Sequence, residues 1–416
     1  MTTVGSADAT ARRIREALWG LACGEAVGRW AAAGGAATAG GTAIAGGAAE
    51  AASRPVGGGG RAAPDPSALE AGPLVRELAA LARAVVAAEG QVDPVALGRE
   101  VSPGTASGDP AGRGGGPQEG RAGGDPRGSR RPGARVGGTQ AQGPWEPAAS
   151  LALAVRAVLA GLINRPDDVE WLVEDVAALA VCEGGTKAGM AGDPVAGGGP
   201  PPSRDEGEVP PAALAAAAAV AAAVSAAVEG DDPESVLDQA VTAASVAVGW
   251  TAGRWPGEGG APRGDEPAAG AGSQRPRPQP FPGDEPAAAV AHAIETLRLT
   301  LAGRGAALPP GGIAAVLTSR WEPEPRPARA VPFALVLAAA AGDARRAVLE
   351  AAGAARAARH GVAAPATAAL AGAVAGALYP GTVPPQWVAA LRGGLGGAQR
   401  VPLELDALVP ELLRLR

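Results

Sequence analysis

The sequence predicts an all-α protein, built as a single large helical domain with Gly/Pro-rich insertions. Of its 416 residues, 64 are Gly and 40 are Pro, yet 47% are hydrophobic. Apolar segments therefore alternate with Gly/Pro-rich ones. Aromatic residues make up only 3% of the chain, so Ala, Val and Leu have to form the core. Ala favours helices and is a poor strand residue, and no segment shows a sustained strand-like alternation.

The predicted helices follow from apolar residues that recur at helical spacing. The first is expected over 7–30, where Ile14 and Leu21 share one face. The second is expected over 67–89, with Leu residues along one side and Gly90 as its stop signal. The remaining helices are expected at 94–99, 147–162, 167–181, 211–228, 235–247, 286–300, 311–318, 331–340, 344–358, 366–378, 386–391 and 403–415.

One domain is expected over 7–401, followed by a C-terminal helix within 402–416. Three insertions, 102–143, 191–209 and 257–282, are expected to be flexible because they contain few large apolar residues. The first insertion is rich in Arg, so one interpretation is an arm that captures an acidic partner. The alternative is a surface insertion without such a role. Interrupting acidic residues and the lack of interleaved aromatics favour this alternative.

The composition excludes several classes of site. The formal net charge of −6 argues against nucleic-acid binding. Cys23 and Cys182 are the only cysteines, and His292 and His360 the only histidines, which excludes a disulfide framework and a zinc site rich in Cys or His. No secretory leader is visible, and the apolar run 212–228 is interpreted as a buried helix, not a membrane span. We therefore expect a cytoplasmic protein with no membrane partner.

Three motifs, in chain order, carry a resemblance to one family. Segment 18–28 reads Leu-Trp-Gly-Leu-Ala-Cys-Gly-Glu-Ala-Val-Gly, and segment 331–343 joins Val-Pro-Phe-Ala-Leu to a Gly-Asp pair. Segment 368–387 is an Ala/Gly helix that exits through Tyr-Pro-Gly and ends in Val-Pro-Pro-Gln-Trp. Together they resemble the ADP-ribosylglycohydrolases of the dinitrogenase-reductase-activating type. Glu25 stands where that family usually has Asp.

Glycines in the last of these motifs predict a close contact between helices. Gly372 and Gly376 are four residues apart and therefore share one helix face. A face without side chains permits another helix to approach closely. Gly20, Gly24 and Gly28 lie in the helix of the first motif.

The resemblance implies a single orthogonal helical domain that removes ADP-ribose from a protein or a small molecule. It also implies two Mg²⁺ or Mn²⁺ ions as cofactors. A Thr-Asp-Asp cluster at the start of an early helix and an Asp-x-Asp-Thr cluster before the last core helix would hold them. Carboxylates are required because hard divalent cations take oxygen ligands, and a pair of ions needs several negative groups. The implied ligand is ADP-ribose or a related nucleotide.

The residues at both cluster positions lack this chemistry. Counting back from the glycines of the last core helix places the second cluster at Ala363, Ala364, Pro365 and Ala366, which have no side-chain oxygen. The first cluster falls near 71–75, which reads Ala-Gly-Pro-Leu-Val. We therefore predict that no metal ion binds at these positions and that no cofactor is used. The sequence then favours a pseudoenzyme that acts as a binding or regulatory module.

An active hydrolase with a metal-independent or altered mechanism is the alternative. Its catalytic residues would be Glu25, Lys187 or His360, and Lys187 follows Thr186 where the family resemblance implies a Thr-His pair. Each of the latter two residues also fits a solvated surface position. The alternative requires that these side chains converge on one concave pocket.

Overall fold

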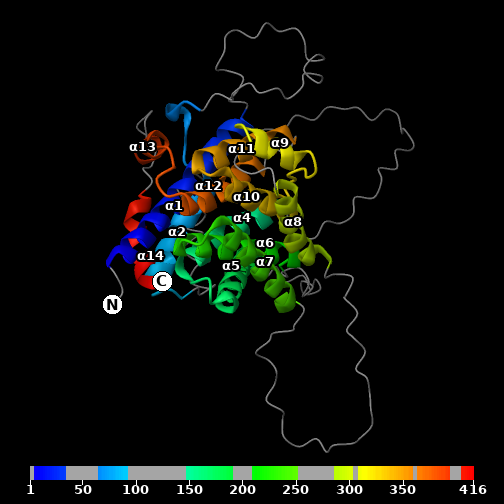
Figure 1. Cartoon of the computed structure of the whole chain (residues 1–416). Coiled ribbons are helices and arrows are strands. Elements are labelled where there is room, and N and C mark those ends of the chain that lie inside the picture. Colours follow the sequence, from blue (N-terminus) through cyan, green and yellow to red (C-terminus); the bar gives the residue numbers. More distant parts are fainter. Residues whose placement is uncertain are drawn as a thin grey trace, which may run out of the picture.

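The computed structural model describes residues 4–33, 64–91, 147–190, 209–251, 285–302, 308–358, 363–393 and 404–416, without the side chains of 4, 5, 147–149, 181–190, 251 and 285–287. Within these ranges every regular element is a helix, which confirms the all-α prediction. Figure 1 shows the helices gathered into one body. They are α1 (Val4–Ala32), η1 (Pro66–Ala68), α2 (Pro73–Ala87), α4 (Pro147–Ile163), α5 (Val169–Met190), α6 (Pro211–Glu229), α7 (Pro233–Thr251), α8 (Glu285–Leu301), α9 (Gly312–Thr318), α10 (Pro327–Ala341), α11 (Ala344–Ala357), α12 (Ala364–Leu378), α13 (Pro385–Gly393), η4 (Leu405–Leu408) and α14 (Val409–Leu415).

The insertions 102–143 and 257–282 and the predicted helix 94–99 lie outside the described residues, as does 191–209 apart from its last residue. Their predicted flexibility therefore stays a prediction.

Helix α6 lies at the centre of the body and packs against α4, α7, α8 and α10. Every residue from Ala213 to Val228 is buried. The Ala and Val side chains are small, so the neighbouring helices approach from several directions. By length and composition α6 is the one described helix apolar enough to cross a membrane, but 89% of that stretch is buried inside the protein. This burial is what the sequence interpretation of 212–228 as a core helix expects.

Helices α1 and α12 pack backbone to backbone, as Figure 1 shows by their adjacent ribbons. A Cβ atom at Gly20 would lie 2.0 Å from the carbonyl oxygen of Gly372, and one at Gly24 would lie 2.1 Å from that of Ala368. A Cβ atom at Gly376 would lie 2.2 Å from the carbonyl oxygen of Glu16. These contacts step by four residues in opposite directions along two antiparallel helices, and no side chain fits between them. The predicted close approach at Gly372 and Gly376 is confirmed, with α1 as the partner.

Several helix boundaries differ from the predictions. The predicted helix 67–89 is divided into the 3₁₀ turn η1 and α2, which begins at Pro73, and α5 continues to Met190, nine residues beyond the predicted end at 181. Helix α10 begins at Pro327, four residues before the predicted start at 331, because Pro is well suited to the first position of a helix. The predicted helix 403–415 is a 3₁₀ turn followed by α14, which packs on α1, α2 and α4. The C-terminal segment is therefore part of the same body.

Candidate functional site

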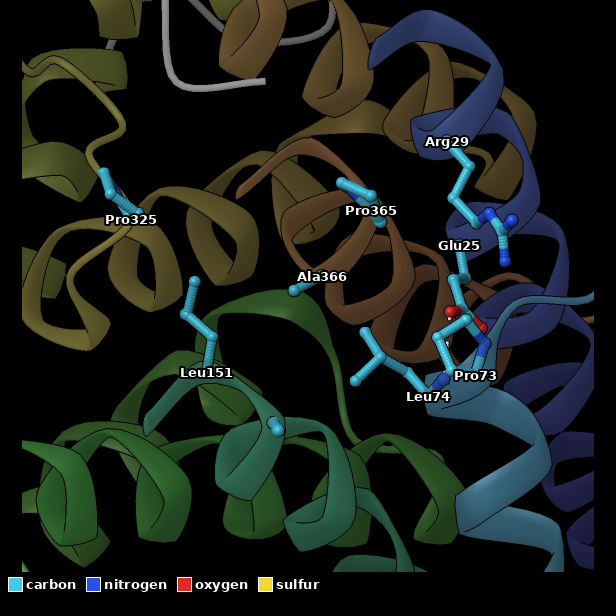
Figure 2. A pocket seen from close by; sticks show the side chains of 9 residues that line it. Glu25, Arg29, Pro73, Leu74, Leu151, Pro325, Pro365 and Ala366 are labelled. Carbon is cyan, nitrogen blue, oxygen red and sulfur yellow. Dashed lines mark hydrogen bonds between the residues drawn. The ribbon is translucent and has the colours of Figure 1, made fainter. Parts of the chain in front are cut away.

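A cavity of about 430 Å³ lies where α1, α2, α4 and α12 meet the segment that precedes α10 (Figure 2). Most of its wall is apolar, and its two charged side chains both come from α1. The lining residues are Glu25, Arg29, Pro73, Leu74, Leu151, Ala152, Pro325, Pro365 and Ala366. This size and composition are typical of small-molecule pockets.

Glu25 caps the N-terminus of α2 from outside that helix. The N-cap residue Gly72 has no side chain to cap the helix, so the first amides of α2 need another acceptor. The carboxylate of Glu25 accepts the N–H of Leu74 at 3.0 Å through Oε1 and the N–H of Val75 at 2.9 Å through Oε2. Figure 2 shows the carboxylate of Glu25 against Pro73 and Leu74 at the cavity wall. Both carboxylate oxygens of Glu25 therefore accept hydrogen bonds from the first turn of α2.

The fit between Glu25 and α2 depends on Gly72. A Cβ atom at this position would lie 1.9 Å from Oε1 of Glu25, so any larger residue would displace the carboxylate. Glu25 itself is 1% exposed. Burial raises the pKa of Glu25, while the two amide hydrogen bonds and the charges of Arg29 and Arg76 act in the opposite direction. The positive end of the α2 dipole also favours the anion.

The structure brings both cluster positions predicted from the family resemblance to this one cavity. Pro73 and Leu74 belong to the first position, and Pro365 and Ala366 belong to the second. Ala363 and Ala364, which complete the second position, are fully buried beside them. Residues that are about 290 positions apart in the sequence therefore share a wall with Glu25 (Figure 2).

The donor set of this cavity does not fit a pair of divalent cations. Thr367 has the nearest side-chain oxygen on α12, but it is fully buried and its Oγ1 donates to the carbonyl oxygen of Ala363 at 2.9 Å. Among the described residues that line the cavity, Glu25 is the one carboxylate. In the part of the chain that the structure describes, no group of three or more His, Cys, Asp or Glu side chains could hold a metal ion. Two Mg²⁺ or Mn²⁺ ions need several anionic oxygens.

Of the three alternative catalytic residues, the structure places Glu25 at the cavity. Lys187 belongs to α5, but its side chain lies outside the described part, and His360 lies outside the described residues altogether. Helix α5 contributes no described residue to the cavity wall. Cys23 is fully buried, and burial strongly raises the pKa of its thiol, which agrees with its interpretation as a small core residue.

Four residues of the cavity wall, Arg29, Leu151, Ala152 and Pro325, were not predicted from the sequence. Arg29 follows Glu25 by four residues, so a helical pairing signal was present. Leu151 and Pro325 carry no such signal, because only the tertiary packing of α4 and of the segment before α10 brings them to the cavity.

In the described part of the chain the fold is all-α, and the cavity lies beside the α1–α12 contact. The sequence profile of the family described as ADP-ribosylglycohydrolase matches residues 209–416, which span α6 to α14. The chain belongs to the ADP-ribosylglycohydrolase family. No curated protein matches the chain. The family match includes α12 and the segment before α10, whereas Glu25 and the start of α2 lie N-terminal to it.

Proposed function

We propose that the protein is a catalytically inactive member of its family and acts as a binding or regulatory module. The observation that carries the proposal is the composition of the cavity wall. The two cluster positions supply Pro73, Leu74, Pro365 and Ala366, none of which offers a side-chain oxygen. The remaining carboxylate, that of Glu25, already accepts two backbone amides. On this proposal the protein uses no metal cofactor, and no hydrolytic step runs through one.

The ligand proposed for the cavity is ADP-ribose or a related nucleotide. Leu74, Leu151 and Pro365 offer an apolar wall for a ring, and Arg29 offers an exposed guanidinium for a phosphate. A guanidinium is well suited to phosphate because it can donate two parallel hydrogen bonds. The family match supports ADP-ribose-containing ligands as the chemical class.

Calorimetric titration with ADP-ribose tests this ligand. Binding should persist in a chelator and should weaken about tenfold in Arg29→Ala, because one charge-assisted contact is lost. Arg83→Ala is the matched control, since Arg83 is exposed at the opposite end of α2. Leu151→Trp should abolish binding by filling the cavity. No heat of binding in the unmodified protein would remove the ligand from the proposal.

The inactive state is tested with an ADP-ribosylated arginine substrate. We expect no release of ADP-ribose, with or without Mg²⁺ or Mn²⁺. Release that a chelator abolishes would overturn the proposal. Release that resists the chelator and disappears in Glu25→Gln, or in variants of Lys187 or His360, would establish the alternative of a hydrolase with an altered mechanism.

Two further parts of the proposal concern the rest of the chain. The role proposed for the Arg-rich insertion 102–143 is capture of an acidic partner. Deletion of the insertion should then abolish binding of that partner and leave the melting temperature unchanged. A cytoplasmic location without membrane or nucleic-acid partners stays a prediction from the sequence. Fractionation of cells that express the full chain tests it.

A further inference from the structure

The C-terminal ends of α4 and α6 meet on the side of the body where α14 packs. The last turn of any helix leaves backbone carbonyls without helical partners, and it carries a partial negative charge. Ser225 of α6 links the two ends, because its Oγ donates to the carbonyl oxygen of Asn164, just beyond α4, at 2.6 Å. Glu229 adds a full negative charge as the last residue of α6. The two helix ends therefore form a pocket lined by hydrogen-bond acceptors.

The guanidinium of Arg416 fills this pocket, and its side chain is 3% exposed. Its donors reach acceptors from both helix ends at once. They are the carbonyl oxygens of Gly161 (2.9 Å), Leu162 (3.3 Å) and Asn164 for Nη1, the carbonyl oxygen and Oγ of Ser225 (3.1 and 3.3 Å) for Nη2, and Oε1 of Glu229 (2.9 Å) for Nε.

This arrangement of acceptors selects a guanidinium over other cations. A guanidinium is planar and presents five N–H donors in a fixed fork, whereas an ammonium is a compact charge with three donors. Every nitrogen of Arg416 has an acceptor, and the acceptors come from two different helices. Removal of the guanidinium would leave several buried carbonyl groups and Glu229 without their partner, which is costly.

We propose that this pocket is a guanidinium-binding site, with Arg416 as its resident ligand. A small guanidinium compound, or an arginine side chain of a peptide, takes the same place when Arg416 is withdrawn. The segment that carries Arg416 is short, since η4 and α14 together span 405–415. It packs on α1, α2 and α4 and buries Leu408, Val409 and Leu412, so Arg416 adds a polar anchor at the end of a segment that apolar side chains also hold.

Chemical rescue of Arg416→Ala tests the site. The variant should melt several degrees below the unmodified protein. Ethylguanidinium at about 50 mM should restore about 3 °C of this loss, if it fills the vacated site at roughly ten times its dissociation constant. Ethylammonium at equal ionic strength should restore nothing, because it lacks the planar fork. The unmodified protein should gain nothing from either compound, since its site is filled.

Glu229→Gln in the Arg416→Ala background is the matched control, because it keeps the size of the side chain and removes the charge. It should abolish the rescue. Equal effects of ethylguanidinium and ethylammonium, or equal stabilisation of the unmodified protein, would overturn the proposal.

A measurement on the unmodified protein covers the case in which Arg416→Ala does not fold. Amide hydrogen exchange of 404–416 should be faster in ethylguanidinium than in ethylammonium, because the former competes with Arg416 for the pocket. Unchanged exchange would also overturn the proposal. The site is separate from the Glu25 cavity, so ADP-ribose binding succeeds or fails independently of this result.

Discussion

Two helices of the protein begin in the same way, each capped by a buried glutamate from a different helix. Glu25 of α1 accepts the amides of Leu74 and Val75 at the start of α2. Glu350 of α11 accepts the amide of Gly311 at 2.9 Å and that of Ala314 at 2.8 Å, at the start of α9. Both side chains are buried, at 1% and 5% exposure, so the two sites use the same chemistry.

The two caps differ in what balances the charge. Arg346 donates to Glu350 at 2.8 Å and also to the carbonyl oxygens of Leu308 and Pro309, so the α9 cap is a closed network. None of the ion pairs found among the described residues includes Glu25, whose carboxylate lies at a cavity wall instead. The comparison indicates that the α9 cap is purely structural, whereas the α2 cap leaves a charge beside space for a ligand.

Removal of the closed network should have the largest effect. Glu350→Ala should lower the free energy of unfolding by about 4 kcal/mol, because two buried amides lose their acceptor and Arg346 loses its partner. Urea unfolding followed by circular dichroism measures the change. Glu322→Ala, at an exposed position, is the control and should cost less than about 0.5 kcal/mol. Equal values for both variants would contradict the structural role of Glu350.

Alanine substitutions of the glycines at the two helix starts should have the next largest effects, and these effects should differ between the two caps. Gly72→Ala should cost about 2.5 kcal/mol, because its Cβ atom would meet Oε1 of Glu25 and push a buried carboxylate off α2. Gly311→Ala should cost about 1 kcal/mol, since it meets nothing within 4 Å and pays only for a φ of +81°. Both values come from denaturant unfolding. The reverse order would show that Glu25 moves aside easily.

Glu25→Gln should have a smaller effect than Gly72→Ala. The amide keeps one acceptor oxygen, but its NH₂ group must face a backbone N–H of α2, which leaves one donor unsatisfied. Relief of the burial penalty on the charge offsets part of this loss, so we expect a cost of about 1 kcal/mol at neutral pH. Thermal unfolding of the two proteins measures it. A loss as large as that of Glu350→Ala would mean that the two caps are energetically alike.

The pH dependence of the same variant should give the smallest effect. The pKa of Glu25 is raised in the folded protein above the ordinary value of 4.5. As the pH rises through 4.5, the unfolded chain releases the proton of Glu25 before the folded protein does. The stability that protonated Glu25 contributes is therefore complete below pH 4.5 and is lost as the pH rises to the raised pKa of the folded state. The stability advantage of the unmodified protein over Glu25→Gln should therefore shrink as pH rises across this window. An advantage that grows with pH would refute this assignment.

The sequence predicts which helices form the site better than it predicts the contacts that side chains make within the site. The spacing of Gly372 and Gly376 predicts the close helix contact, and the family resemblance leads to Pro73 and Pro365, which the structure brings to one cavity. The capping role of Glu25 could not be predicted, because Gly72 carries no side chain and the acceptor comes from about 50 residues away. Local patterns do not encode such contacts.

The same limit applies to the pocket of Arg416. Its acceptors are mainly backbone carbonyls, and carbonyls are identical in every residue. No residue type in the sequence therefore marks the place where the two helix ends meet. Only the packing of α4, α6 and α14 creates it.

The glycine contact between α1 and α12 has a consequence for how this site can change in evolution. The two helices contact each other through main-chain atoms at positions that repeat every four residues. One helix can therefore shift along the other only in whole steps of about 6 Å. Smaller slips would drive a Cβ atom into a carbonyl. The spacing of the α1 and α12 walls is therefore held by main-chain contacts. Pro365 and Ala366, which face the cavity from α12, can change without altering this spacing, whereas Glu25 also caps α2.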